Sequence, residues 1–253
     1  MDRRAFLIKS LGWALAGVVG CSPRGVALAM GRRPRDAAMA VIIDDIGHSR
    51  RRAAAFLAIK ASLTYAVLPH LPYSPDLARA LHDKGHEILL HQPMEPFNRH
   101  LDPGPGALFV GDSAAHIERV VDTNLRAVPF AVGVNNHMGS RFTSHGDDIR
   151  CALQVIKRHK LFFVDSRTTC HSKAYHTACG MRMVSGRRDV FLDTDLRPQA
   201  ILDRLYGVMH HALIHGRAIA IGHPNYETAA ALKTFCSEIQ DTPVRIVPVS
   251  HLL

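Results

Sequence analysis

The chain has 253 residues, of which 47% are hydrophobic and 21% are charged, with a formal net charge of +9, five cysteines and seventeen histidines. This length and apolar fraction allow a sizeable core and exclude a disordered chain, and five cysteines are too few for a disulfide-stabilised scaffold. Because neutral imidazole is the commonest metal ligand in proteins, the histidine count keeps metal chemistry open.

Residues 1–29 have the pattern of an export signal. Arg3 and Arg4 precede the short apolar run 11–20, and small residues follow it. This run is too short to cross a bilayer as a helix. Paired arginines at this place resemble the twin-arginine export signal, so we expect a bacterial protein that is sent across the inner membrane to the periplasm.

Two processing sites stay open at the end of this signal. The A-x-A sequence at 27–29 would release a soluble protein that begins near Met30, and the basic linker 30–37 would follow. The run 18–21 instead resembles a lipobox, in which Cys21 would be acylated and would attach the protein to a membrane. The soluble product is slightly favoured.

The export signal and the linker hold much of the basic excess. Residues 1–29 carry four basic side chains against one acidic side chain, and residues 30–37 carry three against one. The remaining chain is more modestly basic. Nucleic acid is therefore not an expected partner.

From residue 38 onward, short apolar runs alternate with amphipathic segments. The apolar runs predicted as strands are 40–43, 63–68, 87–90, 129–134, 161–164, 218–221 and 244–249. The segments predicted as helices are 49–60, 74–83, 113–126, 146–159, 198–215 and 227–239. This alternation is typical of an α/β protein with a mostly parallel sheet or barrel. We predict a single domain over residues 38–253.

Four cysteines lie outside the export signal. An oxidising compartment permits disulfides between them. Cys170 and Cys179 bracket a short loop and are the favoured pair, whereas four free buried thiols are an equally open alternative.

Polar side chains follow five of the predicted strands, at the point where each strand ends. They belong to the segments Asp44-Asp45, His91 to Glu95, Asn135 to Arg141, Asp165 to Thr168, and His223. Because the carboxyl ends of parallel strands converge at one edge, we expect these side chains to form one site.

The residue types in this set favour a metal. Two adjacent carboxylates after a buried strand, Asp44 and Asp45, are costly unless a cation compensates them, although a turn and helix cap would also explain them. His91 alone is more often a structural histidine, and His223 could cap its strand. His137 follows two asparagines and fits a core badly. An aspartate and two histidines around zinc, with an open position for water, form a known hydrolytic arrangement.

Five motifs in order, IIDDIG, GHEILLHQPMEP, GVNNHMGSRFT, FVDSRT and AIAIGHP, resemble the divergent polysaccharide deacetylase family. This family is a distant branch of the chitin and peptidoglycan deacetylases, and the resemblance covers about residues 38–250. It implies a distorted (β/α) barrel, a divalent metal that is usually zinc, and hydrolysis of an N- or O-acetyl group on a sugar.

The resemblance also implies roles for particular residues. Asp44 matches the catalytic base and Asp45 the aspartate ligand of the metal. His91 matches the first histidine of the H-x-x-x-H metal motif. His223 matches the late histidine that acts as an acid toward the leaving group.

The sequence departs from the family pattern at two places. Glu95 stands where the second motif histidine is expected, so we expect His137 to supply the missing ligand, with Glu95 as the weaker candidate. The usual arginine-proline motif is absent, and Arg141 or Arg167 is the candidate charge that holds Asp44. Residues near the metal or the substrate are expected to include Asn136 and Asp165.

The leading hypothesis is an exported, metal-dependent carbohydrate deacetylase that acts on a cell-envelope or extracellular polysaccharide. The alternative is a catalytically silent carbohydrate-binding or envelope-assembly protein with the same fold. Retention of Asp44 and His223 favours chemistry, and the lost motif histidine favours the alternative.

Overall fold

The computed structural model describes residues 37–253, and the predicted export signal with nearly all of the linker lies outside the described residues. The strands are β1 (Ala37–Ile46), β2 (Thr64–Val67), β3 (Glu87–Met94), β4 (Ala131–Met138), β5 (Phe162–Asp165), β6 (Ser185–Arg187), β7 (Val190–Phe191), β8 (Arg217–Gly222) and β9 (Val244–Ile246). The α-helices are α3 (Arg50–Phe56), α4 (Ser74–His82), α5 (Ala114–Ala127), α6 (Gly146–Arg158), α7 (Ala174–Gly180), α8 (Pro198–His215) and α9 (Tyr226–Glu238). Two 3-10 turns complete the described chain, η1 (Phe142–Ser144) and η2 (Val249–Leu252).

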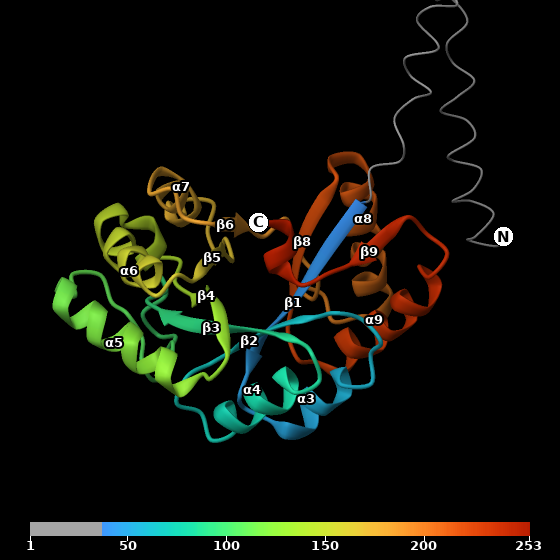
Figure 1. Ribbon diagram of the computed structural model, residues 1–253, viewed down its shortest axis with the longest axis horizontal. Coiled ribbons are helices and arrows are strands. Elements are labelled where there is room, and N and C mark those ends of the chain that lie inside the picture. The colour runs from blue at the N-terminus through green and yellow to red at the C-terminus, as the bar shows by residue number, and fades with distance from the viewer. Residues whose placement is uncertain (1–36) are drawn as a thin grey trace, which may run out of the picture. The chain divides into compact units, whose positions relative to one another are not determined.

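The strands form one parallel sheet in the order β6-β5-β4-β3-β2-β1-β8-β7, and β9 pairs with the first residues of β1. The two outermost strands, β6 and β7, are joined by a link of two residues. Arg188 N donates to Asp165 O at 2.9 Å and Asp189 N donates to Ile219 O at 2.8 Å, so this link touches both β5 and β8. The sheet is therefore curved into a distorted barrel, as predicted, with the helices around its outside (Figure 1).

Alternation along β1 separates the barrel interior from the helix layer. Ala40 and Ile42 belong to a small interior cluster that also contains Val249 and Leu252 of η2. Met39 and Val41 belong to the larger cluster between the strands and the helices. Apolar side chains thus fill the part of the barrel interior that lies before Asp44 along β1. Asp44 continues the inward-facing series and brings a carboxylate to the carboxyl end of the barrel.

Gly133 in β4 lets the ring of Phe162 pack against the sheet. A Cβ at Gly133 would lie 2.3 Å from Phe162 Cε2, and Phe162 is buried. We expect Gly133→Ala to lower the free energy of unfolding by about 1–3 kcal/mol, because the ring must leave its packed position. Urea denaturation measures the change.

The matched control is Gly207→Ala in α8, where nothing lies within 4 Å of the added Cβ. There the exchange improves helix propensity by up to about 1 kcal/mol, so we expect equal or higher stability. Equal stability of Gly133→Ala and the wild type would contradict the packing argument.

Three strands extend further than the sequence predicted. β1 continues to Ile46, β3 to Met94 and β4 to Met138, so Asp44, Asp45, His91 and His137 belong to the strands themselves, whereas Glu95, Arg141, Arg167 and His223 lie in loops that follow strands. Backbone pairing with neighbouring strands maintains these segments, as in the ladder from His91 with Asn135 to Met94 with Met138. The elements that the sequence did not predict are η1, α7, β6 and β7, and the predicted last strand, 244–249, is shortened to β9 and followed by η2.

The favoured disulfide is not present. Cys151, Cys170, Cys179 and Cys236 are all free, and Cys170 and Cys179 are exposed rather than buried. Cys179 Sγ lies 3.7 Å from Ser185 Oγ, so its contact is with a hydroxyl and not with Cys170. Among residues 37–253, no helix has the length and apolar character needed to span a bilayer.

Candidate metal centre

An interruption in β1 turns two neighbouring carboxylates toward the same end of the barrel. Successive residues of a strand normally point to opposite faces. Asp45 has a φ of +56°, and the pairing of β1 with β2 shifts register between Ile43 and Ile46. The Asp44 side chain is buried, and the Asp45 side chain is 28% exposed. Left-handed backbone at a non-glycine residue is strained, and such strain gathers at functional sites.

Asp45, His91 and His137 bring three ligand atoms together. Asp45 Oδ1 lies 2.9 Å from His137 Nδ1 and 3.2 Å from His91 Nε2, and the two nitrogens are 3.2 Å apart. Asp45 Oδ1 is buried, and no donor among the described residues makes a well-aligned hydrogen bond to it. The structure therefore holds an unsatisfied carboxylate oxygen against two imidazole nitrogens, on β1, β3 and β4.

This group fits a divalent metal ion. Nitrogen and oxygen ligands that bind zinc tetrahedrally at about 2.0–2.1 Å are separated by about 3.3 Å from one another. The three observed separations are close to this value. The same three residues form a group that could hold a metal ion, with their ligand atoms all within 4.8 Å of one another. Two imidazoles and a carboxylate are a donor set that suits zinc.

The pKa shifts of Asp45 and His91 show that the cluster favours positive charge. Burial raises the pKa of Asp45, but His137 and His91 beside it lower this pKa by a larger amount. The net pKa lies far below the ordinary range of an aspartate, so this carboxyl is ionised. Burial lowers the pKa of His91, but Asp44 and Asp45 raise it more, and the net shift is upward. A carboxylate that is ionised, and whose neighbouring imidazoles can themselves act as ligands, is a strong metal ligand.

Asn135 holds both His91 and Asp44, and the sequence did not single it out. His91 Nδ1 and Asn135 Oδ1 are 2.8 Å apart, and because the amide oxygen only accepts, His91 carries its proton on Nδ1. This tautomer leaves a lone pair on His91 Nε2, the atom that faces Asp45. Asn135 Nδ2 donates to Asp44 Oδ1 at 2.8 Å. One amide thus orients a candidate ligand and a candidate base.

The sequence predicts Asn136 near the metal or the substrate, but its side chain points away from the cluster. Its Nδ2 donates to Met138 O at 2.8 Å, and its Oδ1 accepts from Ser166 N at 2.9 Å. It therefore ties the end of β4 to the end of β5. Strand alternation could have distinguished the two asparagines, because residues 135 and 137 share a face that 136 does not.

Asp44 is buried and close to the ligand group. Its Oδ2 lies 3.6 Å from His91 Nε2, and its Oδ1 is occupied by Asn135. Burial raises the pKa of Asp44, and the charges of His91 and His223 only partly oppose this effect. One oxygen of Asp44 is thus left without a side-chain donor and faces the cluster.

His223, just after β8, is fixed by Asp193. Nδ1 of His223 lies 2.9 Å from Asp193 Oδ1, and the backbone N of His223 donates to Asp193 Oδ2 at 2.6 Å. Thr228 Oγ1 donates to the same Oδ2 at 2.9 Å, and Phe191 stacks on the imidazole with ring centroids 5.3 Å apart. The Nε2 atom is left facing Asp45 Oδ2 at 3.9 Å.

Asp193 also keeps His223 protonated. Burial lowers the pKa of His223, but Asp193 and then Asp44 raise it, to about 9. Asp193 is not recognisable from the sequence, because it lies just after the two-residue strand β7. The role of Asp193 as the partner of His223 becomes clear only when the distance between the two side chains is known.

A pocket of about 340 Å³ opens beside this cluster. Asp45, His48, Arg52, His223 and Asn225 are among the residues that line it. The pocket therefore reaches the cluster through Asp45, at the carboxyl end of the barrel. A substrate group that entered it would meet Asp45, one of the three candidate ligands, and His223.

Glu95 and Arg141 are not part of the cluster. They form an ion pair with each other, and Glu95 Oε2 also accepts from Val110 N at 2.9 Å. Glu95 therefore holds the loop after β3. The prediction of Glu95 as the weaker ligand candidate required it to lie beside Asp45, and it does not belong to that group. Arg141 does not hold Asp44, because its guanidinium is directed to Glu95.

Asp165 and Arg167 have structural contacts. Asp165 accepts from Arg167 N at 2.8 Å and from Ser172 Oγ at 2.7 Å, so it fixes the loop between β5 and α7. The guanidinium coupled to Asp44 belongs to Arg188, which donates to Ser166 O at 2.6 Å and to Arg167 O at 2.7 Å. Burial and Arg167 lower the pKa of Arg188, and the charge of Asp44 partly opposes this shift.

Fold and site together define the class: a distorted parallel barrel with a carboxylate and imidazole cluster, suited to a divalent metal, at the carboxyl ends of its strands. The sequence model of the divergent polysaccharide deacetylase family matches residues 41–253, and the chain belongs to this family.

Three known proteins resemble the chain in sequence or in fold. The chain is 33% identical to the uncharacterized protein YibQ of Escherichia coli K12 over 85% of this chain and 67% of that protein. It resembles the crystal structure of an uncharacterized protein from Agrobacterium tumefaciens C58, with a TM-score of 0.83, 25% identity and coverage of 88% and 91% of the two chains. A CE4 family pseudoenzyme from Bacillus anthracis shares the fold, with a TM-score of 0.54, 14% identity and coverage of 87% and 66%.

Proposed function

We propose that the protein is a metal-dependent hydrolase that removes acetyl groups from a cell-envelope or extracellular polysaccharide. The observation that carries this proposal is the cluster at the barrel mouth. A metal-ligand group made by Asp45, His91 and His137 lies between a buried carboxylate, Asp44, and a histidine with a free Nε2, His223. Family membership supplies the substrate class.

Asp45, His91 and His137 would hold the metal ion. When bound there, a divalent ion of the zinc type lowers the pKa of water and stabilises negative charge on an acetyl oxygen. Asp45 brings the negative charge that a dication requires. Asn135 accepts from His91 Nδ1, so in the neutral imidazole the proton lies on Nδ1 and Nε2 carries the lone pair for ligation.

Asp44 and His223 would move the protons. The water oxygen bonds to the acetyl carbonyl carbon while Asp44 Oδ2 takes a proton from that water. The bond between the carbonyl carbon and the sugar nitrogen or oxygen then breaks, and His223 Nε2 gives its proton to the leaving atom. Acetate and a free amine or hydroxyl result. Asp193 supports the second step because it holds His223 by Nδ1 and raises its pKa to about 9.

The cellular setting is part of the proposal. Export by the twin-arginine route and a periplasmic location fit a substrate in the cell envelope, and the export motif in residues 1–29 supports them. Cleavage after Ala29 gives a soluble protein, whereas acylation of Cys21 gives a lipid-anchored one. Mass spectrometry of the mature N-terminus distinguishes the two.

Metal removal and acetate release test the proposal together. We expect the purified protein to hold about one divalent ion per chain and to release acetate from N-acetylglucosamine oligomers or from O-acetylated xylan, which represent the amide and the ester. Dialysis against a chelator should remove both the metal and the activity. Added zinc, or another divalent ion, should restore them.

Two outcomes would contradict the proposal. Absence of stoichiometric metal after purification with added zinc would remove its chemical basis. Metal binding with glycan binding but no acetate release would favour the alternative of a catalytically silent glycan-binding protein, for which the pseudoenzyme with this fold offers a precedent.

A further inference from the structure

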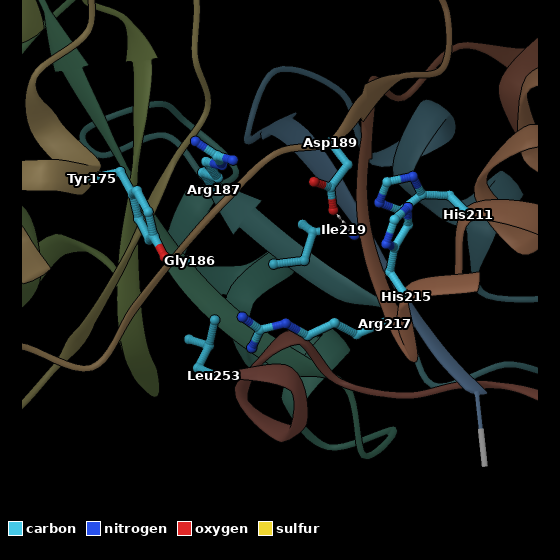
Figure 2. A pocket seen from close by; sticks show the side chains of 9 residues that line it. All are labelled: Tyr175, Gly186, Arg187, Asp189, His211, His215, Arg217, Ile219 and Leu253. Atoms are coloured by element: carbon cyan, nitrogen blue, oxygen red, sulfur yellow. Dashed lines mark hydrogen bonds between the residues drawn. The ribbon is translucent and has the colours of Figure 1, made fainter. Parts of the chain in front are cut away.

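A second pocket lies on the side of the barrel, away from the candidate metal centre. β7 pairs with β8 only at Ala220 and Ile221, so the part of β8 before these residues has no strand between it and β6. A cavity of about 190 Å³ occupies this gap (Figure 2). Gly186 forms one wall, where a Cβ would lie 2.5 Å from Leu253 Cδ2.

The lining of this side pocket is rich in arginine and histidine side chains. Arg187 projects from β6 on one side, and Arg217 from the first residue of β8 on the other. His211 and His215, one turn apart on α8, complete the second side with ring centroids 4.2 Å apart (Figure 2). The one acidic side chain of the lining, Asp189, accepts from Ile219 N at 2.8 Å through Oδ2.

The two guanidiniums retain unused donors. Arg187 lies over the ring of Tyr175, 5.4 Å from its centroid, and its guanidinium makes no hydrogen bond within residues 37–253. Arg217 donates through Nη1 to Leu252 O, which leaves its other nitrogens available. A guanidinium has five N–H donors, so the two arginines offer the pocket several charged donors that make no hydrogen bond to the described residues, beside the single carboxylate of Asp189.

We propose that this side pocket binds a phosphate-type anion, either free or as part of a larger phosphorylated molecule. Arginine forks bind phosphate through paired hydrogen bonds. Donors from β6, β8 and α8 approach the cavity from different directions, which suits a tetrahedral oxyanion with acceptors on all sides better than a planar carboxylate. The function of this site is separate from deacetylation.

Distance keeps the two sites apart. Arg217 begins β8 and His223 directly follows it, so about six residues at about 3.3 Å each separate them, or about 20 Å. Anion binding at Arg217 therefore makes no contact with the cluster of Asp45, His91 and His137. We expect substitutions in the side pocket to leave acetate release unchanged.

Inorganic phosphate is the first probe. Phosphate titrated at constant ionic strength, with chloride as the balancing anion, should raise the Tm of the wild-type protein along a saturable curve. Isothermal titration calorimetry gives the affinity. Arg187→Gln should weaken binding by about tenfold or more, since a charge-assisted contact is lost, and the double variant Arg187→Gln with Arg217→Gln should abolish it.

The controls separate a lost site from a damaged fold. Arg187→Gln removes no hydrogen bond of the protein and only the exposed contact with the Tyr175 ring, so its Tm without phosphate should stay close to that of the wild type. Arg150→Gln changes the same charge at an exposed position of α6 and should bind phosphate as the wild type does. Equal phosphate binding by Arg187→Gln and Arg150→Gln, or no saturable binding by the wild type, would overturn the proposal.

A vesicle arm identifies the source of the anion. Sedimentation with phosphatidylglycerol vesicles, compared with phosphatidylcholine vesicles, tests a phosphodiester at a membrane surface. Binding to phosphatidylglycerol that Arg187→Gln removes supports a lipid headgroup as the ligand. Saturable phosphate binding without vesicle binding supports a small soluble phosphate compound.

Discussion

Replacement of Asp44 by asparagine should reduce acetate release by about 10³-fold or more while the metal stays bound. A general base contributes roughly 10²–10⁴-fold to a rate, and an amide cannot take a proton from water at neutral pH. Asn135 Nδ2 can still donate to the side-chain oxygen at position 44, so the orientation of Asn135 and of His91 should persist. The measurements are kcat/KM for acetate release and metal content by mass spectrometry.

Asp147→Asn provides the matched control, because Asp147 is an exposed carboxylate in the first turn of α6. It should keep wild-type activity and metal content. The Asp44→Asn protein should also fold normally, because the change removes a charge from a buried position. Wild-type activity in Asp44→Asn would refute the role of Asp44 as the base, whatever its metal content.

The convergence of the site was predictable because parallel strands impose it. Asp45, His91 and His137 follow or end apolar runs in the sequence, and β1, β3 and β4 run in the same direction in one sheet. β2 lies between β1 and β3 and ends at Val67, level with Ile46 and Leu90. The longer strands on either side can therefore bring Asp45 and His91 into contact.

The residues that support the site were less visible, because their roles depend on contacts between distant segments. Asp193 follows a strand of two residues, which no periodicity reveals, and it meets His223 only through the pairing of β7 with β8. Arg188 was hidden in the same way, since the link between β6 and β7 crosses the barrel seam. Arg141 was a reasonable candidate by sequence position, but Glu95 occupies its charge.

Asn135 shows that a run of polar residues does not by itself indicate which of its members face the site. Two adjacent asparagines are equivalent in composition, and only the direction of β4 decides which one faces the barrel interior. Residue 133 is a glycine against Phe162, inside the barrel, so 135 and 137 share this inner face. A prediction that had applied strand alternation through the whole motif would have selected Asn135 together with His137.

His137→Ala should remove the metal from the protein. His137 Nδ1 lies 2.9 Å from Asp45 Oδ1 and 3.2 Å from His91 Nε2, so its loss leaves two protein ligands where zinc hydrolases use three. Loss of a group that merely orients a ligand costs 10–100-fold in affinity, so loss of the ligand itself should cost more than about 100-fold. Competition with a chromophoric chelator measures the metal affinity directly, without a substrate.

Two further variants decide what such a loss means. His171→Ala removes an exposed imidazole and should bind metal as the wild type does, which controls for nonspecific binding by surface histidines. Glu95→Gln separates the two candidate ligands, because Glu95 is paired with Arg141 and should leave metal affinity unchanged. If Glu95→Gln loses the metal and His137→Ala keeps it, the ligand group must be Asp45, His91 and Glu95, and Glu95 would have to exchange Arg141 for the metal.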